Sequence, residues 1–479
     1  MKSLNINVIK LKKTTPYWWE YVLIAISGFV MLLLYIYSDF QSLTVWSTYI
    51  WDCLFDGNLY DYYQVVHENA YRAIHAYNGF NYLSLIPWSV WNFPIWLIQR
   101  LTGAAIVDHT LMLAWSKLFL VFSVGIIVYY SNKIICCFLN DDITVKWSNY
   151  MIITSPFLFI AVFLAGQSDI IIIAITVMAV YYLLQGKKMV FLVLMAFSIS
   201  AKPFFIFSYI AVILLIEKNI LKILVDLIIS IAPMLIFNFI YANAPLYQES
   251  VSAGTAGYII EKTVENGIPA TGQAYVPAEI AGKASIVVLG MIFIYFTAYC
   301  INYTERKKNY IIYMLTAPML VYMAFSDYEH YRKVYLLPFL IILFAINKKF
   351  WHVNILLEKI LEVTGVIMVL FKEYAFYLPN INQGLMKRLG IIQDVSKCKY
   401  TGLARFLGDK TGENFAVFQI ICVSIFVAIA IILMFINLPY VARRLPEPKW
   451  KCSRAIYWVD SVFIFLLIGL LFLCYFNLL

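Results

Sequence analysis

Residues 18–38, WWEYVLIAISGFVMLLLYIYS, decide the fold class, because this apolar run is long enough to cross a bilayer as a helix. Lys2, Lys10, Lys12 and Lys13 precede the run and no small-residue cleavage site follows it, so we expect a retained first span with a cytoplasmic N-terminus. The whole 479-residue chain is 63% hydrophobic and only 13% charged. A water-soluble fold could not hide so much apolar surface, so the sequence predicts an integral membrane protein.

Apolar runs recur along the chain and predict an all-helical polytopic protein with about thirteen transmembrane helices. The runs lie at roughly 18–38, 112–138, 148–165, 167–185, 189–201, 203–217, 219–240, 284–303, 309–326, 332–347, 354–371, 413–437 and 456–477. With the N-terminus inside, all short basic loops fall on the cytoplasmic side, as the positive-inside rule requires. These loops hold Lys133 and Lys146, Lys187 and Lys188, Lys218 and Lys222, Arg306 to Lys308, Lys348 and Lys349, and the block ARRLPEPKWKCSR at 442–454. The same bias explains the formal charge of +9 without a nucleic-acid partner.

Two segments test this threading. Residues 82–101 are apolar but contain Pro87, Pro94 and three tryptophans, and a crossing there would move the downstream basic loops outside, so we expect an interfacial helix. Residues 354–371 open with charged residues but must cross to keep the later basic block inside. Three outer segments result, 39–111, 241–283 and 372–412, the last with seven Lys or Arg. Of the eight cysteines, only Cys53 and Cys398 fall clearly in outer segments. A disulfide framework is therefore not expected, and a single bridge between these two remains one alternative.

Asp39 follows the first run, in YIYSDFQSLTVW at 35–46, and is the first acid of the outer loop. An aspartate there can cap the next helix or can act as a reactive carboxylate at the membrane surface. A helix-like stretch with Trp46 and Trp51, the turn GNLYDYY at 57–63 and the interfacial helix beginning at Tyr82 come next. Because the end of the span is uncertain by several residues, three further acids remain reserve candidates for the same role: Asp52, Asp56 and Asp61.

This order of span, acid, amphipathic helix, G-x-L-Y turn and aromatic-proline helix resembles the first outer loop of the GT-C superfamily of glycosyltransferases, which use polyprenyl-phosphate sugars. AGQSD at 165–169 and SAKPFF at 200–205 resemble the G-Q and K-P elements of its polyprenol-phosphate-mannose-dependent branch, and both fall at the outer face. The loop 241–283 resembles the superfamily's second main outer loop. The resemblance covers about residues 18–340. It departs from some branches, which carry a D-x-D pair in the first loop, because here Asp39 is followed by Phe40 and Gln41; this argues against a metal held by paired aspartates.

The resemblance implies a catalytic module at 1–240, an outer loop at 241–283 and C-terminal transmembrane helices at 284–479. The donor would be a polyprenyl-phosphate sugar and the acceptor a glycan or glycolipid, with membrane lipid around them and no cofactor. A lipid-phosphate leaving group needs no general acid, but the acceptor hydroxyl must lose a proton, and Asp39 is placed to take it. The departing phosphate needs positive charge, for which Lys202 is a candidate; the alternative is that it snorkels to the headgroups.

The segment FSDYEHYRKVYLLP at 325–338 gathers charges in a short outer turn. His330 and Arg332 could grip the donor phosphate, or the turn could be a solvated one with internal ion pairs. Gln167 and Asp169 could hydrogen-bond sugar hydroxyls or orient a basic residue, and the alternative for Asp169 is that it caps a helix. Tyr82 completes the set of expected substrate-binding residues. Several loop residues do not have zinc-site spacing, namely His67, His75, Asp108 and His109.

Two other functions remain open. A polysaccharide polymerase with diphosphate-linked donors would be expected to carry several outer arginines, but those of this chain are scattered: Arg72, Arg100, Arg332, Arg388 and Arg405. A flippase or transporter would be expected to carry charges in mid-membrane and an internal repeat. We find no repeat, and only Asp226 and Asp460 lie near span interiors. The bias toward Ile, Lys, Asn and Tyr indicates an AT-rich bacterial genome.

Overall fold

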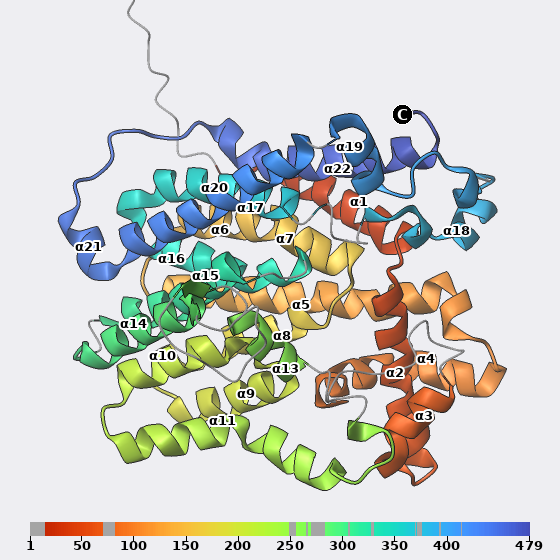
Figure 1. Ribbon diagram of the computed structural model, residues 1–479, viewed down its shortest axis with the longest axis horizontal. Coiled ribbons are helices and arrows are strands. Elements are labelled where there is room, and N and C mark those ends of the chain that lie inside the picture. The colour runs from red at the N-terminus through yellow and green to blue at the C-terminus, as the bar shows by residue number, and fades with distance from the viewer. Residues whose placement is uncertain are drawn as a thin grey trace, which may run out of the picture.

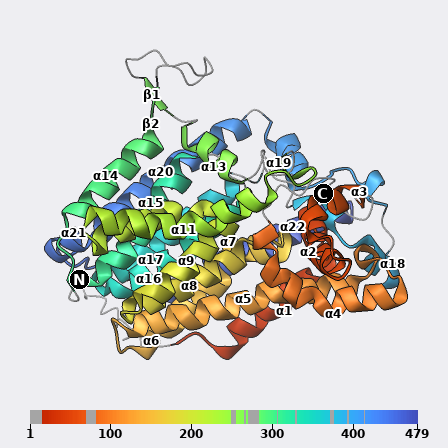
Figure 2. The same ribbon diagram turned by 90° about the horizontal axis from the view of Figure 1, so that it is seen from below.

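The computed structural model of the protein describes residues 15–69, 82–248, 255–264, 267–269, 283–304, 307–326, 330–368, 370, 376–391, 394–412 and 414–479. Within these ranges the chain is almost entirely helical, which confirms the predicted all-helical class. The strands in the described part are β1 (Gly267–Pro269) and β2 (Lys283–Ser285), which pair antiparallel. Figure 2 shows this ribbon projecting from one side of the helical body.

The longer helices run side by side, along the horizontal direction of Figure 1. They are α1 (Trp18–Leu34), α5 (Thr110–Cys136), α6 (Asp142–Thr154), α8 (Asp169–Leu184), α9 (Lys188–Ala201), α10 (Ile206–Ile216), α11 (Ile220–Tyr241), α14 (Ile286–Cys300), α15 (Asn309–Phe325), α16 (Leu337–Ile346), α17 (Trp351–Ile367), α20 (Asn414–Asn437) and α22 (Val459–Tyr475). Shorter helices are α7 (Pro156–Phe159), α13 (Thr255–Val264) and α21 (Pro439–Arg444). Single turns that matter below are η3 (Tyr82–Ser84), η5 (Ile160–Leu164), η6 (Pro203–Phe205) and η8 (His330–Leu336).

Four helices in the described ranges are long and apolar enough to cross a membrane: α5, α11, α20 and the stretch Arg454–Tyr475. The number rises to six if each of two bent helix pairs counts as one span. The prediction of about thirteen spans is therefore not supported at this criterion. The remaining apolar helices have 10–17 residues. At 1.5 Å per residue even the longest of them is only about 25 Å long, less than the roughly 30 Å of a hydrocarbon core.

The first bent pair, α6 with α7 and η5, has a local cause for its 46° bend. Pro156 lacks an N–H group and starts α7, and the Ser155 side chain accepts a hydrogen bond from the Leu158 amide as its N-cap. The second pair, Tyr331–Ile346 with Lys348–Ile367, is bent by 98°. The segment predicted at 354–371 is thus α17, which begins at Trp351 and follows a sharp turn rather than a straight crossing.

Basic side chains from distant loops meet at one end of the bundle, at the left of Figure 1 near α21. The Lys349 ammonium donates to the Ala442 carbonyl at 3.1 Å, and Lys308 donates to the carbonyl of Leu184 at 3.0 Å. Lys348 forms an ion pair with Asp141 at the same end. These contacts bring the segments around Asp141, Leu184, Lys308, Lys349 and Ala442 together in pairs at this end, while the predicted sidedness of the basic loops stays a prediction.

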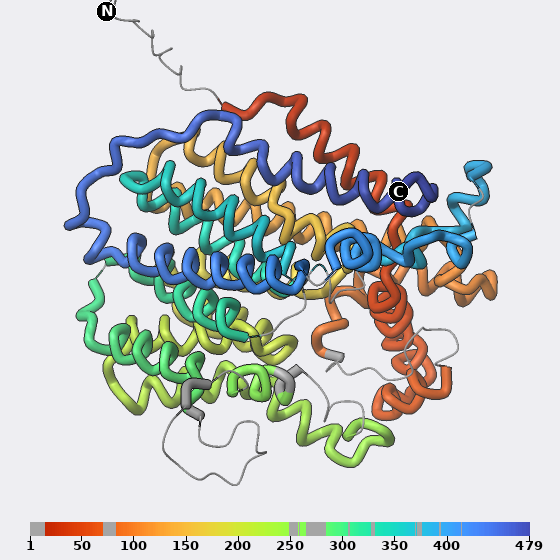
Figure 3. Tube along the Cα trace, turned by 45° about the horizontal axis from the view of Figure 1, so that its top comes forward, coloured from red at the N-terminus to blue at the C-terminus, as the bar shows by residue number. Residues whose placement is uncertain are grey.

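The opposite end of the bundle carries a separate layer of helices, at the right in Figures 1 and 3. This layer contains α2 (Ser38–Phe55), α3 (Tyr62–Glu68), α4 (Ile86–Thr102), α18 (Gln383–Arg388) and α19 (Leu403–Thr411). In Figure 1, α2 turns steeply away from the direction of α1 and of the bundle. The predicted interfacial helix at 82–101 corresponds to η3 and α4, and α4 packs against α2 and α5. This layer and the adjoining helix ends hold the candidate site.

Candidate functional site

Asp39 lies in the first turn of α2 and is partly buried. The N-cap position belongs to Tyr37, and no side chain caps this helix end by a hydrogen bond. The alternative that Asp39 is simply the N-cap residue is therefore wrong for this structure. Its Oδ2 instead accepts a hydrogen bond from the Gln167 side-chain amide, at 3.4 Å.

The corner between α1 and α2 is held by a segment from the far end of the chain. The Ile36 amide donates to the Asn380 carbonyl at 2.7 Å, and the Asn382 amide donates to the Leu34 carbonyl at 2.7 Å. The buried Tyr35 hydroxyl bonds both the carbonyl and the amide of Tyr377. Residues 377–382, part of a segment that the sequence left without a role, therefore fix the backbone that carries Asp39.

Lys117 supports the same corner from inside the bundle. Its ammonium is buried at 1% exposure and donates to the Tyr35 and Phe163 carbonyls, at 2.7 and 2.6 Å. It thereby ties α5 to the end of α1 and to the π-helical turn η5, and π-helical turns often mark functional sites. From the sequence alone, Lys117 is only a single lysine near the start of a predicted span, and this role could not be predicted.

The AGQSD motif follows η5 and meets Asp39 through a close backbone approach. Gly166 has a φ of +61°, in the left-handed region that favours glycine. A Cβ atom at Gly166 would stand 2.7 Å from Cδ2 of Phe40, so the ring of Phe40 packs directly on this glycine. The contact brings the residue after Asp39 against the residue before Gln167, which explains how the two motifs come together.

Asp169 lies at the first turn of α8 and is fully buried. Its Oδ2 is 2.7 Å from Nζ of Lys202, and its Oδ1 accepts a hydrogen bond from the Tyr335 hydroxyl at 2.5 Å. Lys202 is itself only 2% exposed. The side chain of Asp169 therefore holds a basic residue, as one of its predicted roles required, and does not cap the helix. Lys202 likewise has a protein partner and does not snorkel to the surface.

Arg332 lies in η8, is partly buried, and has its guanidinium 5.2 Å from the ring centre of Phe204 in the SAKPFF motif. It shares η8 with Tyr335, whose hydroxyl donates to Asp169. The side chains of His330 and Tyr82 lie outside the described part of the structure. The η3 turn that contains Tyr82 packs against α9, the helix that ends next to Lys202. Five predicted residues thus gather at one end of the bundle: Asp39, Gln167, Asp169, Lys202 and Arg332.

The three reserve acids lie elsewhere. Asp52 and Asp56 face Arg100 of α4, and Asp61 belongs to the turn η1 (Leu59–Asp61). Asp52 stands 13 residues beyond Asp39 on the same helix, which corresponds to about 20 Å along its axis. These acids therefore do not share the site of Asp39. Cys53 and Cys398 are free thiols, as are the other six cysteines.

A second polar centre, which the sequence did not reveal, lies inside the C-terminal half. Glu358 and Glu362 of α17 and Asp460 of α22 have carboxylate oxygens within 4.8 Å of one another. Lys359 forms ion pairs with Glu358, at 2.6 Å, and with Asp460. All four side chains are at most 2% exposed. The four are called the α17 cluster below; because its lysine already supplies a cation, we assign no metal to it.

No known protein family, curated protein or solved structure matches this chain in sequence or in fold.

Proposed function

We propose that this protein is a membrane glycosyltransferase that moves a sugar, with inversion, from a polyprenyl-phosphate carrier to a glycan or glycolipid at the extracytoplasmic face of a bacterial membrane. One observation carries the proposal. Residues from four sequence motifs, up to about 300 positions apart, meet at the end of the bundle opposite the basic loops. In this assignment the basic end is cytoplasmic. The apolar helices then cross the membrane, and α8 and α10 are among the short ones that lie mostly buried within the protein.

The chemistry follows from the groups present. The acceptor hydroxyl oxygen attacks the anomeric carbon while the bond from that carbon to the phosphate oxygen breaks. The hydroxyl proton passes to the Asp39 carboxylate, and the lipid phosphate leaves with the bonding electrons. Gln167 orients the carboxylate through the hydrogen bond to its Oδ2.

Arg332 and Lys202 differ in solvent exposure, and we assign them different roles for that reason. Arg332 is partly accessible and is the residue that contacts the departing phosphate, since a guanidinium binds phosphate oxygens in a bidentate manner. Lys202 is a positioning residue, because it is sealed against Asp169 and helps to fix the turn next to Gln167. The sequence suggested Lys202 as a phosphate ligand; in this proposal Arg332 has that role and Lys202 does not contact the phosphate.

The test uses purified protein in lipid nanodiscs with a panel of polyprenyl-phosphate and polyprenyl-diphosphate sugars. We expect transfer from a monophosphate donor, reduced by about 100-fold or more in Asp39→Asn because the base is lost. The matched control is Asp108→Asn, an exposed acid of the same outer layer, which should transfer at the wild-type rate. Unchanged transfer by Asp39→Asn would contradict the proposal. Transfer from diphosphate donors alone would favour the polymerase.

The α17 cluster favours a second candidate function, a flippase or transporter. Charged side chains inside a membrane region are costly and commonly mark ion or proton pathways. The sequence placed only Asp226 and Asp460 near span interiors, but the structure adds Glu358, Lys359 and Glu362 to the buried interior. If lipid-linked glycan moves across proteoliposomes at a rate that falls in Glu362→Gln, while no sugar transfer is found, the protein is a transporter.

A further inference from the structure

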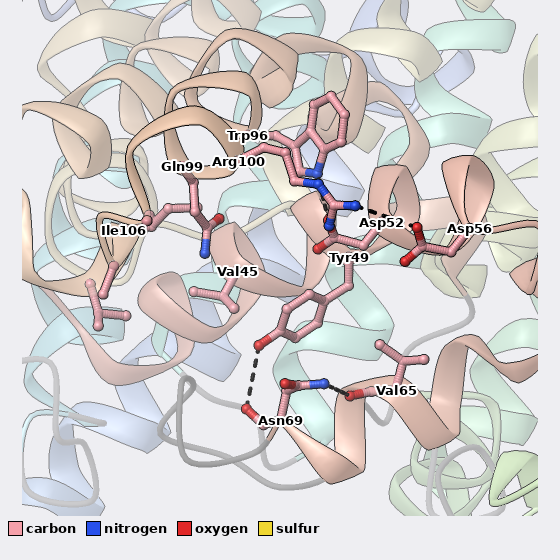
Figure 4. Close-up of a pocket in the computed structure, with 13 residues that line it drawn as sticks. Val45, Tyr49, Asp52, Asp56, Val65, Asn69, Trp96, Gln99, Arg100 and Ile106 are labelled. Atoms are coloured by element: carbon pink, nitrogen blue, oxygen red, sulfur yellow. Dashed lines mark hydrogen bonds and ion pairs between the residues drawn. The ribbon is translucent and has the colours of Figure 1, made fainter.

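A cavity of about 420 Å³ lies in the outer layer between α2 and α4, away from Asp39 (Figure 4). Four side chains of α2 line one wall, and their spacing of four, three and four residues places them on one helical face: Val45, Tyr49, Asp52 and Asp56. The opposite wall comes from α4, again at helical spacing, with Trp96, Gln99 and Arg100. The volume is within the usual range for sites that bind small molecules.

The carboxylates of this cavity are held in place. Arg100 lies between them, 3.7 Å from the Asp52 Oδ1 atom and 3.6 Å from the Asp56 Oδ1 atom. The Trp96 indole N–H donates to Asp52 Oδ1 at 2.8 Å. Figure 4 shows the three charged groups together at one end of the cavity. Their side chains remain accessible, with exposed fractions of 57% for Arg100, 25% for Asp52 and 50% for Asp56.

Further polar groups line the remaining wall. The Gln99 Oε1 atom is buried and has no hydrogen-bond partner within the described part of the chain. Because this oxygen has no exposed surface, the group that Gln99 offers to a ligand is its side-chain amide N–H, which points into the cavity and can donate to a hydroxyl oxygen (Figure 4). Tyr49 contributes a hydroxyl whose bond to the Asn69 carbonyl is long, at 3.3 Å. Phe55 stacks on Trp96 at 5.0 Å and is 64% exposed, which gives the layer an aromatic edge.

The charge of the cavity selects the class of ligand. Two carboxylates against one guanidinium leave a net charge of −1, which repels a phosphate group. The ligand must therefore be uncharged or cationic, with hydroxyl groups that donate to the carboxylates and accept from the Gln99 amide. We propose that this cavity binds a neutral saccharide, the glycan part of the acceptor. The identification as acceptor rests on the proposed function, whereas saccharide binding itself does not.

Binding is tested directly on the full-length protein, without a donor. The probes are neutral di- and trisaccharides of glucose, galactose, mannose and N-acetylglucosamine, followed by saturation-transfer NMR and calorimetry. At least one saccharide should bind, and Asp52→Asn should weaken it about tenfold or more, because one charge-assisted hydrogen bond is lost. Gln99→Leu should weaken it as well, and Asp61→Asn, outside the cavity, should not. Two variants are used so that the conclusion does not depend on a single variant that fails to fold.

Each other outcome separates this inference from the proposed function. If no saccharide binds, or if binding is the same in Asp52→Asn and Gln99→Leu, the saccharide site is refuted even when sugar transfer is found. If spermidine binds in place of saccharides, the cavity is a cation site and the inference also fails. If saccharides bind as expected but no donor is used, the cavity assignment stands while the glycosyltransferase does not.

Discussion

The ion pair between Asp169 and Lys202 gives the sharpest quantitative prediction. Both side chains are at most 2% exposed, and their charged atoms are 2.7 Å apart. Asp169→Asn removes the negative charge but keeps an oxygen that can still accept from Tyr335. It leaves the Lys202 ammonium buried without its counter-ion. Removing one partner of a buried pair costs about 3–5 kcal/mol, so we expect the free energy of unfolding to fall by that amount.

A double-mutant cycle separates the pair from its surroundings. Lys202→Met has nearly the same length without the charge and should destabilise the protein by a similar amount, whereas the double variant should recover most of the loss. The measurement is the free energy of unfolding from an SDS titration in mixed micelles, followed by tryptophan fluorescence. The control is the exposed pair Asp394–Lys397, with charged atoms 3.7 Å apart, where Asp394→Asn should cause no measurable change. Strictly additive losses in the cycle would refute the reasoning.

Three further predictions concern glycine, pH and the α17 cluster. Gly166→Ala should lower the free energy of unfolding by about 2–4 kcal/mol, since it combines a positive φ with a steric clash. The control is Gly186→Ala, at φ +77° with open space around it, which should cost only about 1–2 kcal/mol. Equal losses in thermal unfolding would contradict this prediction. The Lys348 ammonium lowers the pKa of Asp141 from 3.8 to about 2, so this pair stabilises the fold above about pH 4 and the contribution disappears as the pH falls toward 2; Asp141→Asn should flatten the stability profile in that window. Lys359→Met should lower the free energy of unfolding by about 3–5 kcal/mol, and a stable variant would show that the carboxyl groups are already neutral.

Apolar composition predicted the helical class, but it could not set the number of spans. Hydropathy averaged along the sequence does not distinguish α10, a helix of 11 residues, from α20, a helix of 24 residues, because both are apolar throughout. Only the helix ends, set by caps and prolines, show that several apolar runs are too short to pass a length criterion. The 98° bend before α17 is equally invisible, because it depends on how its two arms pack rather than on composition.

Some residues of the candidate site could be identified from the sequence, and others could not. Asp39, Gln167 and Lys202 could be found because each belongs to a short motif next to a predicted span end. Tyr335 and Lys117 could not, since tyrosines and single lysines near span ends are common in membrane proteins, and their roles come from tertiary contacts alone. The periodicity of apolar residues predicts which side chains are neighbours within one helix. The hydrogen bonds of Lys117 to Tyr35 and of Tyr335 to Asp169 join residues more than 80 positions apart, so periodicity cannot predict them.

The motifs on which the glycosyltransferase proposal rests end near residue 340, yet the later residues do not form an independent unit. The corner that carries Asp39 hydrogen-bonds to residues 377–382, and the buried Glu20 of α1 accepts two hydrogen bonds from Arg454. Ser155 of the N-terminal half donates to Glu362 in the α17 cluster. Cutting the chain near 340 would therefore leave buried polar groups unpaired on both sides, at a cost of about 1–3 kcal/mol for each. We infer that both halves must fold together before Asp39 can take its place, so the C-terminal half contributes to the site although it supplies none of its reacting groups.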